Sequence, residues 1–424
     1  GLQSLVCGLA ILVVEVAVGL QCATFGDLGY ALGGKWVGRI MRGTQTLSNA
    51  LFMPICIALA TDALRQVGLN AAQCQTNLFE PDPGSTCAWW DETINSLIIC
   101  SCVAWPVLLL LSDVVVLSWM SMFAMVLILV QTFVICSYSA HHDPSGMLLV
   151  TWRRFGRWDH DWEDAVSALG TLIYSFCPMF LAVEVSSSMR RPPLIKWALL
   201  LSFAYSLFIT MTVGIVVDTH WGGLVKDPVT DAMFGGSAAV LCNVVLMFCA
   251  FTDFAIVGSL LNREVQRIFF PKYDRTCRLR NMPTWVYITF PALVFTLVFD
   301  FCIPYLEALK GFVACFAVPC SMFFGPAGLL ILRSRRTAPS SNVDVAIKAA
   351  GGDFPCNRIL VLLGVTLGLV LTVAFFAQTI SDLGHGTPTD PLSARNWRVF
   401  GKPLWHSDRY HPAWRVQIPV GWKF

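Results

Sequence analysis

Ten apolar stretches separated by polar links follow one another along most of the chain. We predict membrane-spanning helices at about Leu2–Cys22, Gln45–Leu64, Ile94–Leu111, Val116–Tyr138, Ala165–Ser186, Leu194–Val217, Met233–Leu261, Trp285–Tyr305, Gly311–Leu332 and Ile359–Ile380. Each comes close to the roughly 20 residues that a helix needs to cross a bilayer. Helices are expected rather than strands, because backbone groups in lipid must bond internally and a barrel would need short alternating segments.

The composition is that of a chain surrounded by lipid. Of its 424 residues, 56% are hydrophobic and 13% are charged, whereas soluble domains average about 45–50% and about 25%. These values exclude a disordered protein and disfavour a soluble enzyme. The 29 basic and 27 acidic residues nearly cancel, so no nucleic-acid partner is expected.

Basic residues are concentrated in alternate links, and this predicts the orientation. The link after the first predicted span and every second link after it carry sixteen Lys and Arg, against six in the opposite links. The positive-inside rule makes the richer side cytoplasmic. Both ends of the chain then face outward, and the chain starts at Gly1 rather than Met, directly before an apolar run. We therefore expect a further helix to precede residue 1.

Two cysteines are predicted to form a disulfide. Most of the sixteen Cys lie within predicted spans, where they act as small apolar residues. Cys74 and Cys87 share one outer link, on the oxidising side of the membrane. A pair of free thiols is the alternative. The sequence has no paired CxxC and no HExxH pattern, so we expect no metal site.

The predicted span Ala165–Ser186 contains Pro178 near its middle. Proline cannot donate a backbone hydrogen bond there, and its ring clashes with the carbonyl of Tyr174. Carbonyls freed at that depth must face protein, water or a ligand. The polar side chains before the break are Thr171, Tyr174, Ser175 and Cys177. Broken helices of this kind form substrate and ion sites in many secondary carriers, and a simple packed kink is the alternative.

Ionisable residues inside spans are costly and mark functional candidates. Glu15, Asp253 and Asp300 are the deepest. Asp62, Asp113 and Glu184 lie near span ends, where we interpret them as satisfied interfacial residues.

Four stretches of the chain resemble the amino acid/auxin permease family of the amino acid–polyamine–organocation superfamily. The first is TFGDLGYALG, from Thr24 to Gly33. The others are Pro106–Ser118, the broken span with its Met189–Pro193 turn, and the region containing Ile303, Pro304, Gly311 and Pro326. Their order and spacing resemble the family from about residue 2 to 380.

The resemblance implies an all-α membrane protein with the inverted-repeat, LeuT-like carrier fold, lacking its first helix. The ten spans would be helices two to eleven, in a carrier domain of residues 1–380 followed by a polar, non-cytoplasmic tail of residues 381–424. The resemblance also makes Ser48 and Asn49 candidates to face the substrate, together with Thr171, Tyr174, Ser175 and Cys177 from the broken helix.

On this basis the sequence predicts a secondary active transporter of small amino acids that needs no cofactor. We favour H+ over Na+ as the coupling ion, with Asp253 as the proton site, although the neighbouring Thr252 could ligate sodium instead. Glu15 is a second proton candidate, or it only pairs with a basic residue. The expected partners are an amino acid and the lipid of a plasma, vacuolar or lysosomal membrane. A non-transporting amino acid sensor, an incomplete carrier fragment and a channel are the rival interpretations.

Overall fold

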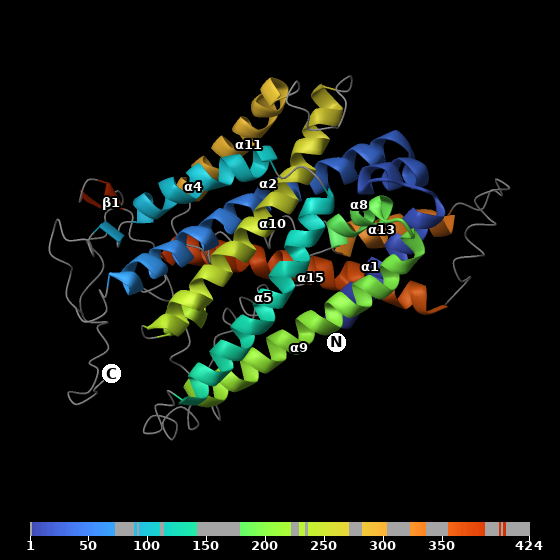
Figure 1. Cartoon of the computed structure of the whole chain (residues 1–424). Helices are drawn as coiled ribbons and strands as arrows, with labels where there is room; N and C mark the ends of the chain where they lie inside the picture. Colours follow the sequence, from blue (N-terminus) through green and yellow to red (C-terminus); the bar gives the residue numbers. More distant parts are fainter. Residues whose placement is uncertain are drawn as a thin grey trace.

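The computed structural model describes residues 2–72, 89–90, 93–110, 114–141, 179–221, 229–233, 236–270, 282–302, 323–335, 355–385, 398–399 and 402–403. These residues contain ten α-helices: α1 (Leu2–Gly19), α2 (Phe25–Ala71), α4 (Thr93–Leu110), α5 (Val114–His141), α8 (Met179–Ser188), α9 (Ile195–Trp221), α10 (Ser237–Phe269), α11 (Met282–Cys302), α13 (Gly325–Arg335) and α15 (Pro355–His385). They also contain two short 3-10 helices, η2 (Pro192–Leu194) and η4 (Val229–Ala232), and an antiparallel ribbon of β1 (Arg398–Val399) and β2 (Lys402–Pro403) (Figure 1).

The helical architecture predicted from the apolar stretches is confirmed for these residues. Four helical stretches are long and apolar enough to cross a bilayer, namely Phe25–Ala71, Val116–His141, Pro192–His220 and Ser237–Phe269. Only the last eight residues of the predicted span Ala165–Ser186 are described, at the start of α8. The inverted-repeat arrangement of a LeuT-like carrier stays a prediction.

The link between the first two predicted spans is helical, which corrects the sequence interpretation of residues 23–44 as a polar link. Helix α2 already begins at Phe25. The Thr24 hydroxyl caps this end, because its Oγ1 accepts a hydrogen bond from the backbone N–H of Asp27 at 3.0 Å. Gly34 interrupts the helix with φ +80°, a conformation that glycine adopts at little cost.

The two arms of this interrupted helix pack closely against each other. A Cβ added at Gly38 would lie 2.3 Å from the Tyr30 ring, and one added at Gly29 would lie 3.0 Å from the Cα of Gly38. The absence of side chains at these positions allows the approach. As a result, Arg42 on the second arm reaches Asp27 on the first.

Buried apolar side chains form two main clusters. One joins α1 and the first arm of α2 with α8, α9, α13 and α15, and the other joins the second arm of α2 with α4, α10 and α11. Helices α5 and α9 lie side by side (Figure 1), where the Tyr205 hydroxyl donates a hydrogen bond to the carbonyl of Met125 at 2.6 Å. Their outer faces expose large apolar side chains such as Phe133 and Leu201, which is the surface that lipid would cover.

Candidate functional site

The candidate site lies along the contact between α2 and α10, which run antiparallel. Arg42, near the middle of α2, meets Glu264 near the end of α10. Further along α2, Ala60 packs in one cluster with Ala250, which is earlier on α10. Residues that are far apart in the sequence are therefore brought into register along this pair of helices.

Two predicted substrate-facing residues lie buried on α2. Ser48 is 2% exposed and Asn49 is fully buried. The Ser48 hydroxyl and both polar atoms of the Asn49 side chain have no hydrogen-bond partner among the described residues. A buried polar group without a partner costs about 1–3 kcal/mol, so these groups mark a place suited to a polar ligand.

Helix α10 carries a third such residue, which was not predicted from the sequence. Asn262 is fully buried, and neither polar atom of its carboxamide has a partner among the described residues. The predicted span ends at Leu261, which leaves Asn262 in the basic link. The helical spacing of Phe254, Gly258 and Asn262, four residues apart, was the signal that could have found it.

Two of the predicted coupling residues, Thr252 and Asp253, lie earlier on α10, away from the end predicted to be cytoplasmic. Asp253 is exposed, and its carboxylate is within electrostatic range of the Cys56 and Cys249 thiols. Helical geometry puts Asp253 about 120° around α10 from Leu241, which is 44% exposed on the apolar face. Asp253 therefore points away from that face. The buried Thr252 hydroxyl donates to the Phe248 carbonyl at 2.9 Å, which leaves its oxygen lone pairs available.

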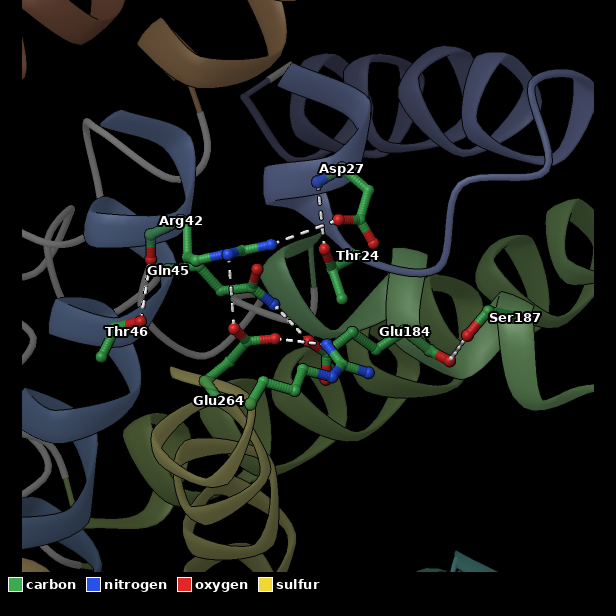
Figure 2. A network of polar contacts seen from close by, with 9 residues as sticks. Thr24, Asp27, Arg42, Gln45, Thr46, Glu184, Ser187 and Glu264 are labelled. Atoms are coloured by element: carbon green, nitrogen blue, oxygen red, sulfur yellow. Dashed lines mark hydrogen bonds and ion pairs between the residues drawn. The ribbon is translucent and has the colours of Figure 1, made fainter. Parts of the chain in front are cut away.

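Four charged residues form what we call the inner ion cluster, at the end of the helix pair predicted to be cytoplasmic (Figure 2). Arg42 lies 3.3 Å from Asp27, measured from Nη2 to Oδ1, and 3.5 Å from Glu264, measured from Nε to Oε2. Glu264 is 1% exposed and also pairs with Arg267. One buried carboxylate thus holds two guanidinium groups, which ties α2 to α10.

A hydrogen bond attaches α8 to this cluster. The Gln45 Nε2 donates to Glu184 Oε1 at 3.0 Å, and both side chains are buried (Figure 2). Within α8 the Ser187 hydroxyl donates to the Glu184 carbonyl at 2.8 Å. Glu184 was interpreted as a satisfied interfacial residue, and the structure shows a direct partner for its side chain. The ends of α2, α8 and α10 therefore meet at one point.

Glu15, the second proton candidate, lies away from this helix pair. It is on α1, where its Oε1 is 3.9 Å from the Lys196 Nζ on α9. The two side chains are 29% and 45% exposed, respectively.

The remaining predicted site residues lie outside the described part of the chain. These are Thr171, Tyr174, Ser175 and Cys177 of the predicted broken helix, and Cys74 and Cys87 of the predicted disulfide. Within the part that is described, no group of three or more His, Cys, Asp or Glu residues could hold a metal ion.

Comparison with known protein families gives one match. A family model described as transmembrane amino acid transporter protein matches residues 1–344. A comparison with curated proteins returned no match. The matched range contains α1 to α13 and with them every contact of the candidate site.

Proposed function

We propose, from the premise that this chain belongs to the transmembrane amino acid transporter family, that it is a secondary active transporter of small amino acids driven by a proton gradient. Membership makes the chain an integral multi-pass membrane protein of a transporter family, and not a member of an enzyme family. The substrate class, the coupling ion and the residues below are the proposal.

One observation supports the proposed position of the substrate site. Ser48 and Asn49 are buried polar side chains, in a predicted membrane span, without hydrogen-bond partners among the described residues. Polar groups inside a membrane bundle normally pair or line a pathway. We propose that these two groups contact the substrate, together with Thr171, Tyr174, Ser175 and Cys177, which the sequence places in a helix broken at Pro178.

Asp253 is proposed as the proton site. It is accessible, it points away from the exposed apolar face of α10, and it lies on the same helix pair as Ser48 and Asn49. A carboxyl group that gains and loses a proton during transport needs such a position, away from lipid and open to a water-filled space. Thr252, whose oxygen keeps free lone pairs, is the residue to consider if sodium proves to be the driving ion.

The inner ion cluster is proposed to close the cytoplasmic end of the pathway. Alternating access requires parts of the bundle to move against each other around the site. Such movement on the cytoplasmic side would separate α2 from α10, and this breaks the contacts of Glu264 with Arg42 and Arg267.

Uptake by purified full chain in liposomes tests the proposal. Radiolabelled small neutral amino acids should accumulate when the outside is acidified, and they should not respond to a sodium gradient. Asp253→Asn should abolish accumulation driven by the pH gradient while exchange of labelled for unlabelled substrate persists, because the substrate contacts remain.

Asp218→Asn is the matched control, because Asp218 is exposed near the end of α9 and lies outside the proposed site. It should behave like the wild type. Proton-driven accumulation that survives in Asp253→Asn would show that Asp253 is not the coupling residue. Amino acid binding without any uptake would instead identify a sensor. A fluorescent fusion would show whether the protein resides in the plasma membrane or in a vacuolar or lysosomal membrane.

A further inference from the structure

The register of α2 and α10 places two carboxamides opposite each other. The Met53 Cε lies 3.3 Å from the position that a Cβ would take at Gly258, so these two residues meet across the helix pair. One helical turn from each, toward the inner ion cluster, are Asn49 on α2 and Asn262 on α10. Residues four apart share a helix face, and the helices are antiparallel. Asn49 and Asn262 are therefore at the same level on facing surfaces.

These two amides are not bonded to each other. All four of their polar atoms are buried and lack a hydrogen-bond partner among the described residues. Two facing amides that could pair but do not pair leave four hydrogen-bonding atoms unused inside the helix bundle. Because buried polar atoms are normally hydrogen-bonded, we expect a third group to form hydrogen bonds with both amides.

Close contacts flank the two amides on both sides along the helix pair. On the cytoplasmic side, Gln45 and Glu264 of the adjoining turns hold the contacts with Glu184 and the arginines. On the other side, Met53 and Leu108 crowd against Gly258, where an added Cβ would lie 2.3 Å from the Leu108 Cδ2. Two unpaired amides between a charged contact and an apolar contact suit the binding of a small polar solute.

The donors and acceptors of the two amides indicate which class of solute would bind. Each carboxamide is neutral and offers two N–H donors together with one acceptor oxygen. A cation would use only the oxygens and an anion only the N–H groups, and either would bring an uncompensated charge. An amino acid zwitterion uses both, since its ammonium donates to the oxygens and its carboxylate accepts from the N–H groups.

We propose that Asn262 is a further substrate-binding residue, which together with Asn49 holds the α-ammonium and α-carboxylate of the transported amino acid. This inference rests on the proposed transport function and extends it. Because these two groups are common to all amino acids, the contact recognises the class and not the individual side chain.

Purified full chain in liposomes tests this with Asn262→Leu, which removes the polar atoms at similar volume. The concentration for half-maximal uptake should rise about ten- to hundredfold, the range expected for loss of hydrogen bonds to charged groups. The rise should be equal for glycine, alanine and larger neutral amino acids. The unfolding temperature without substrate should not fall, because an unpaired buried polar group is replaced by an apolar one.

Competition by substrate analogues tests binding directly, because a purely structural role of Asn262 would leave the competition unchanged. Alaninamide, which lacks the carboxylate, should compete far less well than alanine for the wild type. In Asn262→Leu the difference between alanine and alaninamide should shrink, because one of the two amides that read the carboxylate is gone.

Asn243→Leu is the matched control. Asn243 is also a fully buried asparagine on α10, but its Nδ2 donates to the Ala239 carbonyl at 3.1 Å. Its half-saturation concentration should equal that of the wild type. If Asn262→Leu does not fold, Asn262→Ser, which keeps a smaller polar group, should show an intermediate rise.

The outcomes distinguish failure of the Asn262 inference from failure of the proposed transport function. Wild-type half-saturation and unchanged analogue discrimination in a folded Asn262 variant would overturn the inference. If the wild type neither takes up amino acids nor is stabilised by them against thermal unfolding, the proposed transport function fails, and the inference fails with it.

Discussion

Replacing Glu264 with Gln tests whether the inner ion cluster holds the ends of α2 and α10 together. The substitution keeps the shape of the side chain and removes its charge. Arg42 then keeps its contact with Asp27, while Arg267 loses the carboxylate with which it pairs. We expect the cytoplasmic end of the helix pair to open more often.

The free-energy cost of Glu264→Gln follows from how deeply the three side chains are buried. Glu264 is 1% exposed, whereas Arg42 and Arg267 are 29% and 27% exposed. Removing one partner of a fully buried pair costs about 3–5 kcal/mol. Water reaches both guanidinium groups and compensates part of this loss, so we expect about 2–3 kcal/mol. A change of that size raises the population of the opened end about 30- to 150-fold.

Hydrogen–deuterium exchange of the protein in lipid nanodiscs measures this opening. Backbone amides in the last turns of α10 should exchange about 30- to 150-fold faster in Glu264→Gln. Asp27→Asn is the matched comparison in the same cluster. Asp27 is 40% exposed, so its ion pair contributes at most about 1 kcal/mol and exchange should rise no more than about fivefold. An equal increase in the exchange rate in both variants, or no increase in Glu264→Gln, would refute the reasoning.

Three smaller predictions concern the surroundings of this cluster. Glu15→Gln should change the free energy of unfolding by less than about 1 kcal/mol, because its pair with Lys196 is partly exposed; loss of proton-driven uptake in this variant would assign Glu15 a coupling role instead. Thr24→Ala should lower the free energy of unfolding by about 1 kcal/mol through loss of the helix cap, and an unchanged thermal unfolding curve would contradict the cap. Gln45→Ala should cost about 1.5–3 kcal/mol, because the buried Glu184 carboxylate loses a donor; chemical unfolding of the solubilised protein measures this, and a cost below that of Thr24→Ala would argue against the contact.

The positions of the helices could be predicted because membrane spans are encoded locally. Each apolar stretch is long enough to require a helix in lipid, whatever its neighbours are. The predicted boundaries failed in residues 23–44, where Lys35, Arg39 and Arg42 suggested a link. That segment is helical because Thr24 caps it and because its glycines let two helical arms pack together, and this close packing does not appear in a hydropathy pattern.

The candidate site was predicted only in part, for a similar reason. Ser48 and Asn49 were identified by resemblance, and their burial without partners is a structural observation. Asn262 follows an apolar span and precedes several basic residues, so hydropathy assigned it to the surface. Only the antiparallel register of α2 and α10, in which Met53 meets Gly258, indicates that it lies at the level of Asn49.

The sequence by itself determined the lipid setting of this protein, its predominantly helical structure and the predicted cytoplasmic side, because hydrophobic length and loop charge act within single segments. The tertiary structure decided which polar residues meet. Arg42 pairs with Glu264, and Gln45 bonds with Glu184 across 139 positions of the chain. Contacts of that kind depend on how the helices pack, since a polar group inside the bundle is stable only beside the partner that packing brings to it.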